Sequence, residues 1–125
     1  MDTITNIETT TTDRPGGFHG LVAVGMAEEL AVRTIRLTRT IRGHRDLVDQ
    51  LTRAIESVAL NLAEGSGRAG RDRAYHYTVA YGSAGESATA VRLLAAYGAI
   101  SAACADELLG RIDSVRAICW RLARR

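Results

Sequence analysis

The sequence predicts an all-α protein that folds as an antiparallel up-down four-helix bundle. Its 125 residues suit one domain with a real hydrophobic core. Apolar residues make up 46% and aromatic residues only 5%, and the apolar set is mostly Ala, Leu, Val and Ile, which favours closely packed helices. The only proline is Pro15, and most of the 12 glycines fall at expected segment ends, unlike the regular spacing typical of β-sandwiches.

The first 20 residues differ in composition from the rest of the chain. They are rich in threonine and contain Pro15, Gly16 and Gly17, so they hold too little apolar area to offset the entropy of ordering. We expect a flexible tail over residues 1–20 and a bundle domain over residues 21–125.

The first two helices are predicted from the spacing of apolar residues. Between Leu21 and Ile41, apolar and small residues follow the i, i+3, i+4, i+7 rule, and Gly43 is expected to end this helix. A second helix should begin near Asp46, since an acidic residue suits a first turn. Its apolar face comprises Leu47, Leu51, Ile55, Val58 and Leu62. The glycines of the run EGSGRAG, residues 64–70, should end it.

The last two helices are predicted from their expected ends. Asp72 is a candidate N-cap for the third helix, and Gly98 is its expected stop. Ser101 is the candidate N-cap of the fourth helix, whose apolar residues repeat at helical spacing from Ala105 to Leu122. Short connections make consecutive helices antiparallel neighbours, which leads to the up-down topology.

Polar residues accompany the apolar face of the second helix. Ser57, Asn61, Glu64 and Arg68 recur at i, i+4, i+7 and i+11, so they form a stripe beside that face. Asn61 and Glu64 could in principle act as an acid-base pair, but neither a nucleophile nor a metal set accompanies them. We therefore expect them to specify the fold.

The third helix carries a complementary set of small residues. Gly82, Ser83 and Gly85 would let another helix approach closely, with Glu86 beside them. Buried amides and carboxylates need hydrogen-bond partners. We predict an interhelical hydrogen-bonded network that contains Asn61, Glu64, Ser83 and Glu86.

These segments match the hallmark of a known family. The pattern Q-x-x-R-A-x-x-S-I-x-x-N-I-A-E-G is matched, with Val58 and Leu62 in place of isoleucine, by Gln50, Arg53, Ala54, Ser57, Val58, Asn61, Leu62, Ala63, Glu64 and Gly65. A Gly-Ser-x-x-Glu element in the next helix is matched by Gly82, Ser83 and Glu86. The chain resembles the four-helix bundle family that includes proteins encoded in intervening sequences of bacterial 23S rRNA genes and the accessory variability protein of diversity-generating retroelements.

The resemblance implies an assembly and a class of partner. It implies a homo-oligomer, a pentameric ring of four-helix bundles with a basic surface. In the retroelement branch such a ring serves a reverse transcriptase and its RNA. We therefore expect this chain to associate with itself and with nucleic acid, and to act as an accessory to a reverse transcriptase or another RNA-handling enzyme.

Charge is unevenly distributed along the chain. The net charge is only +2, but residues 33–45 hold five arginines and no acid: Arg33, Arg36, Arg39, Arg42 and Arg45. Their spacing places the first four around the side of the first helix away from its apolar stripe, where they could bind RNA or DNA phosphates without base specificity. An ordinary solvated face would look the same, so a protein-protein adaptor ring without nucleic-acid binding remains an alternative.

An enzyme is the second alternative. Arg71 and His76 match the R-x4-6-H motif of HEPN ribonucleases, in which the histidine acts on a ribose hydroxyl and the arginine holds the phosphate. The motif is short, and His19 and His44 also follow an arginine by five residues, so we expect no enzymatic activity. The tyrosines are expected to pack, and Trp120 could anchor a subunit contact.

Cysteine usage and hydropathy indicate the compartment. Cys104 and Cys119 would lie roughly 22 Å apart along one helix, too far for a disulfide, and are expected to fill the core or an interface. No metal-ligand spacing appears, so neither a metal nor a cofactor is expected. Without a signal-peptide pattern or a long apolar run, we expect a cytoplasmic protein with no membrane contact.

Overall fold

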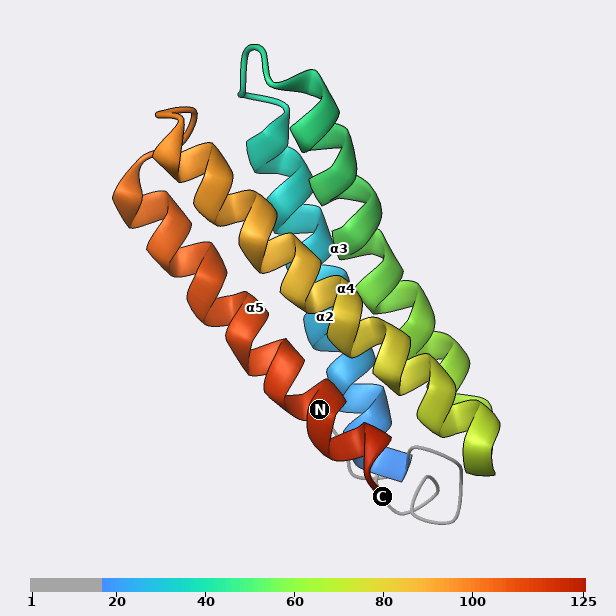
Figure 1. The fold of residues 1–125 in the computed structure, drawn as a ribbon. Coiled ribbons are helices and arrows are strands. Elements are labelled where there is room, and N and C mark those ends of the chain that lie inside the picture. Colours follow the sequence, from blue (N-terminus) through green and yellow to red (C-terminus); the bar gives the residue numbers. More distant parts are fainter. Residues whose placement is uncertain (1–16) are drawn as a thin grey trace.

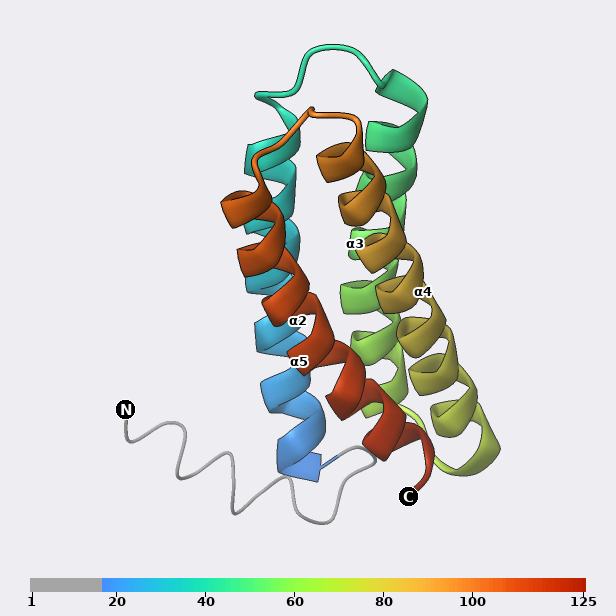
Figure 2. The ribbon, with the colours of Figure 1, turned by 60° about the vertical axis from the view of Figure 1, so that its left-hand side comes forward.

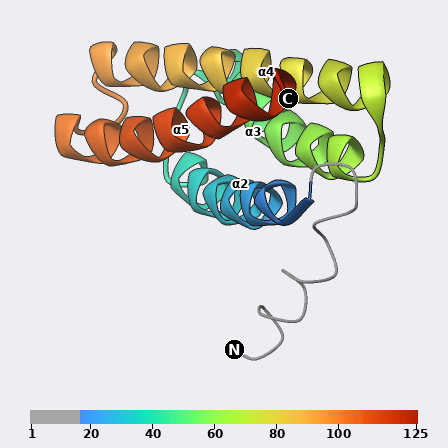
Figure 3. The same cartoon turned by 90° about the horizontal axis from the view of Figure 1, so that it is seen from below.

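The structure of the protein is a computed structural model that describes residues 17–125. Four helices lie within this range, namely α2 (Gly17–Thr38), α3 (Arg45–Ser66), α4 (Gly70–Ala96) and α5 (Ala102–Ala123). Consecutive helices run antiparallel (Figure 1), and the turned views show α5 returning beside α2 (Figures 2 and 3). The predicted all-α four-helix bundle is confirmed.

The predicted boundary between tail and bundle is wrong by one turn. Residues 17–20 belong to the first turn of α2, although the sequence assigns them to the tail. Gly20 is buried in this turn, and a β-carbon there would lie 3.0 Å from the Tyr77 hydroxyl. The rest of the predicted tail, residues 1–16, lies outside the described residues.

The helix ends follow local capping chemistry at two of the predicted positions. The Ser101 hydroxyl accepts a hydrogen bond from the Cys104 amide at 3.1 Å, so the predicted N-cap of α5 is confirmed. Gly98 adopts φ of 78° directly after the C-cap of α4, the left-handed conformation that stops a helix. Gly43 also has a positive φ, of 80°, but α2 already ends at Thr38, so the prediction that Gly43 ends this helix is wrong. Asp72 is not an N-cap, because α4 already begins at Gly70 and Asp72 lies in its first turn.

The core contains the apolar stripes predicted for α2, α3 and α5, together with a buried face of α4 that the sequence did not predict. Within the described residues, the largest fully buried apolar side chains come from three helices: Leu51, Ile55, Val58 and Leu62 of α3, Tyr77, Val91 and Leu94 of α4, and Leu108, Ile112 and Val115 of α5. The α2 stripe is made of small residues, alanines with Leu30 and Thr34, and the buried Thr34 hydroxyl donates to the Leu30 carbonyl at 2.7 Å. Small side chains therefore allow α2 to pack closely, and the buried polar group is satisfied.

Close packing between α3 and α4 depends on Gly65. A β-carbon at this position would lie 2.6 Å from Cε1 of Tyr77, whose ring is completely buried. The predicted close approach at Gly82 and Gly85 is wrong. Gly82 is exposed with open space around it, and Gly85 faces the Arg116 side chain, because the buried face of α4 runs instead through Ala80, Ala84 and Ala88.

The two cysteines are free thiols, as predicted. Cys119 is buried in the core and Cys104 is partly exposed. Burial raises the pKa of the Cys119 thiol to about 12, since the thiolate would lose its hydration. Among the described residues, no helix is long and apolar enough to cross a membrane.

Candidate nucleic-acid interface

The arginine block lies in three structural settings rather than on one helix. The α2 helix ends at Thr38, and the chain then turns through hydrogen bonds from the Thr40 amide to the Leu37 carbonyl and from the Ile41 amide to the Thr38 carbonyl. The prediction that the arginines continue around one helix is therefore wrong beyond Thr38. Two arginines lie on α2, two in the connection to α3, and one is the first residue of α3: Arg33 and Arg36, Arg39 and Arg42, and Arg45.

The connection that carries Arg42 is held against the end of α4. His44, with φ of 52°, is the N-cap of α3, and its ring stacks on Tyr97 with 5.4 Å between ring centroids and 12° between planes. The His44 side chain does not cap α3, so the first N–H groups of that helix keep no side-chain acceptor there. Free helix N–H groups beside Arg45 add positive potential at this end of the bundle.

One of the five arginines is engaged within the fold. Arg33 Nη1 lies 3.2 Å from Glu107 Oε1 on α5, and Arg33 Nη2 lies 3.9 Å from Glu29 Oε1 on α2. Arg111 of α5 reaches the same Glu29 oxygen at 3.8 Å, so four charges bridge α2 and α5. Arg33 is exposed, as expected, but its charge is largely balanced by acids. It is a poorer phosphate ligand than the sequence suggests.

The other four arginines carry uncompensated charge. Their side chains are exposed, and none forms an ion pair with a residue of the range 17–125: Arg36, Arg39, Arg42 and Arg45. A guanidinium without an acidic partner has all its donors available for phosphate oxygens.

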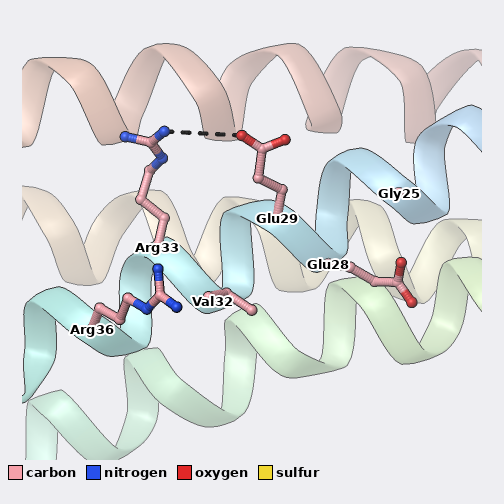
Figure 4. Close-up of a pocket in the computed structure, with 6 residues that line it drawn as sticks. All are labelled: Gly25, Glu28, Glu29, Val32, Arg33 and Arg36. Carbon is pink, nitrogen blue, oxygen red and sulfur yellow. Dashed lines mark ion pairs between the residues drawn. The ribbon is translucent and has the colours of Figure 1, made fainter.

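A shallow groove borders this basic region along α2. It has a volume of about 690 Å³ and is lined by Gly25, Glu28, Glu29, Val32, Arg33 and Arg36 (Figure 4). In Figure 4, Arg33 and Glu29 extend to the same side of α2 and are joined by their ion pair. Glu28 points away from this pair. The groove is acidic toward the start of α2, so its basic residues lie toward the end of α2.

A chain of polar side chains crosses the interface between α3 and α4. The hydroxyls of Ser57 and Ser83 lie 2.8 Å apart, and Asn61 Nδ2 donates to Ser57 Oγ at 3.1 Å and to the Ser57 carbonyl at 2.9 Å. Asn61 Oδ1 therefore faces His76 Nδ1 at 3.0 Å, and because the amide oxygen can only accept, His76 Nδ1 is the donor. The predicted network exists, but its composition differs from the prediction.

Two predicted members of the network face solvent. Glu64 is exposed and pairs with Arg68 at 3.1 Å, and Arg68 also pairs with Asp72 at 2.8 Å. The hydrogen bond to Glu64, together with nearby Asp72, raises the pKa of the Arg68 guanidinium. One residue turns a helix by about 100°, so when Gly65 contacts α4 its neighbour Glu64 points to water.

Glu86 likewise lies at the surface with other hallmark residues. A shallow groove of about 260 Å³ between α3 and α4 is lined by Gln50, Arg53, Ala54, Ser57, Ser83 and Glu86. Gln50, Arg53 and Glu86 are exposed at its rim, and Ser57 and Ser83 form its floor through their mutual hydrogen bond. The hallmark thus divides into a buried part that joins the helices and a solvated part.

His76 belongs to the network, although the sequence suggested for it only a role in a nuclease motif. The spacing of Asn61 and His76 along the chain could have predicted their contact. Asn61 and His76 lie at nearly equal distances along the chain from the turn between α3 and α4, at residues 67–69, and antiparallel helices place such residues opposite each other. The exposed Arg71, its partner in the nuclease hypothesis, takes no part in the polar chain.

Comparison with known proteins assigns the chain to a family. The family model of the 23S rRNA-intervening sequence protein matches residues 20–121. None of the curated proteins compared with this chain matches it. A crystal structure from Bacteroides thetaiotaomicron, of a protein with unknown function from the S23 ribosomal protein family, superposes with a TM-score of 0.78 at 17% identity, covering 86% of this chain and 99% of that one. That likeness concerns the fold alone. Because the family model spans the whole bundle with the hallmark of α3 and α4, the chain belongs to the 23S rRNA-intervening sequence protein family.

Proposed function

We propose that this protein binds the phosphate backbone of RNA or DNA, without base specificity, through the basic end of α2 and the connection to α3. The observation that carries the proposal is the set of four exposed guanidinium groups without acidic partners in the described range: Arg36, Arg39, Arg42 and Arg45. Arg33, in contrast, is paired with Glu107 and Glu29.

The physical basis of the proposed binding is local charge rather than net charge. The chain as a whole carries only +2, which gives weak long-range attraction. A cluster of guanidinium groups releases condensed counterions from a nucleic acid, and each phosphate contact adds to the affinity. The stack of His44 on Tyr97 holds the connection in place, which lowers the entropy lost on binding.

Repetition would strengthen a weak site of this kind. The resemblance implies a pentameric ring, and in a homo-oligomer the same basic patch recurs in every subunit, so one long nucleic acid would contact several patches. We include self-association in the proposal, together with an accessory role toward a reverse transcriptase or another RNA-handling enzyme. A ring that binds a protein and no nucleic acid is the competing proposal.

The test is the salt dependence of RNA binding. Affinity for a fluorescein-labelled RNA should fall steeply between about 50 and 200 mM salt, as expected for several phosphate contacts. The double variant Arg36→Glu/Arg39→Glu should lose binding at low salt. The matched control Arg53→Glu/Arg92→Glu makes the same charge change at exposed positions of α3 and α4, and should lose much less. Equal losses in both variants, or no binding by the unaltered protein at low salt, would contradict the proposal.

Substitution of a different residue, Arg71, tests the ribonuclease alternative. His76 contributes to the α3–α4 interface, so His76→Ala would perturb structure as well as any chemistry. Arg71 is exposed and in no ion pair with a described residue, so Arg71→Ala tests the nuclease motif without that effect. RNA cleavage that Arg71→Ala abolishes would favour the enzyme.

A further inference from the structure

The outward face of α5 carries a stripe of residues that is rich in arginine and contains one aromatic ring. This stripe is separate from the basic end of α2. Its members recur at i, i+3, i+4, i+7, i+8 and i+11, within an arc of roughly 140° around the helix. They are Asp113, Arg116, Ala117, Trp120, Arg121 and Arg124. The buried residues of α5, which run from Ala105 to Leu122, occupy the opposite side. The stripe is therefore a solvent-facing surface in the isolated chain.

Between this stripe and α4 lies an open groove. Its volume is about 560 Å³, and its lining adds Tyr81 of α4 to five residues of the stripe, Asp113 to Arg121. The α4 and α5 helices lie side by side along it (Figures 1 and 3). Two aromatic rings and two arginines, Arg116 and Arg121, thus line the groove, and Arg124 lies over the Trp120 ring.

Both rings are already paired with guanidinium groups. The guanidinium carbon of Arg116 lies 4.4 Å from the centre of the Tyr81 ring, and that of Arg124 lies 3.7 Å from the Trp120 ring. Trp120 keeps 44% of its surface exposed, which is costly for the largest apolar side chain when nothing covers it. A flat π-system that takes the place of the Arg124 guanidinium on Trp120 would cover that area and release Arg124 for a phosphate.

Within residues 17–125, the cations of the stripe have no acidic partner, and only Arg124 is held by a hydrogen bond, from its Nη1 atom to the Trp120 carbonyl at 3.1 Å. Arg116, Arg121 and Arg124 form no ion pair with a described residue, although Asp113 lies on the same stripe. The Arg116 Nε atom is buried and has no hydrogen-bond acceptor in the described range. Buried donors are nearly always paired, so an acceptor brought by a ligand would satisfy this group after a small shift of the side chain.

We propose that the α4–α5 groove is a binding site for single-stranded nucleic acid, in which an unstacked base lies on Trp120 while Arg116, Arg121 and Arg124 hold the neighbouring phosphates. Aromatic platforms flanked by arginines bind single strands with little base preference, because every base has a π-face. Asp113 supplies an acceptor for a base amino group or a ribose hydroxyl. A duplex hides its base faces and cannot use Trp120. The inference rests on the proposed function and adds that this groove binds single strands in preference to duplexes.

The experiment uses Trp120 as its own probe, since it is the only tryptophan of the chain. Its fluorescence is followed while the full-length protein is titrated with a twelve-nucleotide oligouridylate, and in parallel with an RNA duplex of the same length. The single strand should quench the emission, and the duplex should leave it nearly unchanged at equal occupancy. Unquenched emission with the single strand bound would overturn the inference.

Variants then measure the contribution of stacking by anisotropy of labelled RNA. Trp120→Ala should weaken single-strand binding by about 5- to 100-fold, the range expected for one stacked base, and leave duplex binding within about twofold. Trp120→Phe keeps an aromatic face and should recover most of the affinity. Circular dichroism checks that both variants fold, which the surface position of Trp120 favours.

The outcomes separate this inference from the proposed function. If the single strand and duplex bind equally and Trp120→Ala changes neither affinity, the stacking site is wrong and backbone binding stands. If Trp120→Ala alters the sedimentation coefficient and not RNA affinity, the groove is a contact between copies of the chain, which also overturns the inference. If the unaltered protein binds no RNA at low salt, both proposals fail together.

Discussion

Asn61 Oδ1 and His76 Nδ1 lie 3.0 Å apart and join α3 to α4 across the turn at residues 67–69. The Asn61 amide group also donates to Ser57. Its oxygen therefore accepts from α4, while its nitrogen donates within α3. The Asn61–His76 hydrogen bond crosses between the helices and so fixes the rotation of α3 against α4, and the bonds to Ser57 within α3 hold the Asn61 side chain in place.

The Asn61→Ala variant should be destabilised by about 1–3 kcal/mol, since it leaves His76 Nδ1 without its acceptor in a partly buried position. The free energy of unfolding is measured by urea denaturation with circular dichroism. Gln50→Ala is the control, because Gln50 is an exposed amide on the same helix and should change stability by less than about 0.5 kcal/mol. Equal effects of the two variants would contradict the assigned role of Asn61.

The contact between Gly65 and Tyr77 gives a second prediction. A β-carbon at position 65 would lie 2.6 Å from Tyr77 Cε1, so Gly65→Ala forces the buried ring to move and should cost about 1–3 kcal/mol. The same substitution at Gly82, an exposed helix position with open space, should instead stabilise by about 0.5–1 kcal/mol. In thermal denaturation, the melting temperature should fall for Gly65→Ala and rise for Gly82→Ala.

Introducing Tyr77→Leu into the Gly65→Ala background provides the double-mutant cycle. The smaller side chain makes room for the added methyl group, so the two changes should be less destabilising together than their sum. Additive losses would mean that Gly65 is required for a reason other than the Tyr77 ring.

The thiol of Cys119 gives a pH-dependent prediction. Burial raises its pKa to about 12 in the folded protein, against about 9 for an exposed thiol. At pH 8 a thiol reagent should therefore modify Cys104, which is partly exposed, and spare Cys119 until the protein unfolds. The Cys104→Ser variant isolates the slow reaction, and its rate should rise with urea as global unfolding does.

The same shift predicts a loss of stability at alkaline pH. Between about pH 9 and 12 the unfolded chain releases the Cys119 proton while the folded chain retains it, so the free energy of unfolding falls as pH rises. The contribution is fully present below pH 9. Burial also raises the pKa of Tyr77, which acts in the same direction, so the Cys119→Ala variant is compared with the unaltered protein. If the free energy of unfolding declines less steeply with pH in the variant, the difference is the contribution of Cys119. Identical slopes in the two proteins would contradict this contribution.

Much of the fold could be predicted because it depends on local chemistry. The apolar stripe from Leu51 to Leu62 faces the core, the Ser101 hydroxyl caps α5, and Gly98 adopts the left-handed conformation at the end of α4. Each of these depends on residues within about one helical turn, so a single sequence contains the necessary information.

The candidate site was predicted only in part, because it depends on how helices are rotated and paired. Glu64 and Gly65 are neighbours in the hallmark, and only the packing of Tyr77 decides that the glycine faces inward and the acid outward. The charge of Arg33 is balanced by Glu107, which is 74 residues away along the chain.

The sequence by itself determined the helices, their order, the buried faces of α2, α3 and α5 and the family hallmark, because periodicity and capping act over a few residues. Tertiary structure alone decided three further features: which acids face water, that His76 completes the polar chain, and that Tyr81 and Arg116 meet beside Trp120. The physical reason is that helical spacing places a side chain on a face, whereas its partner depends on a contact between helices that no local pattern encodes.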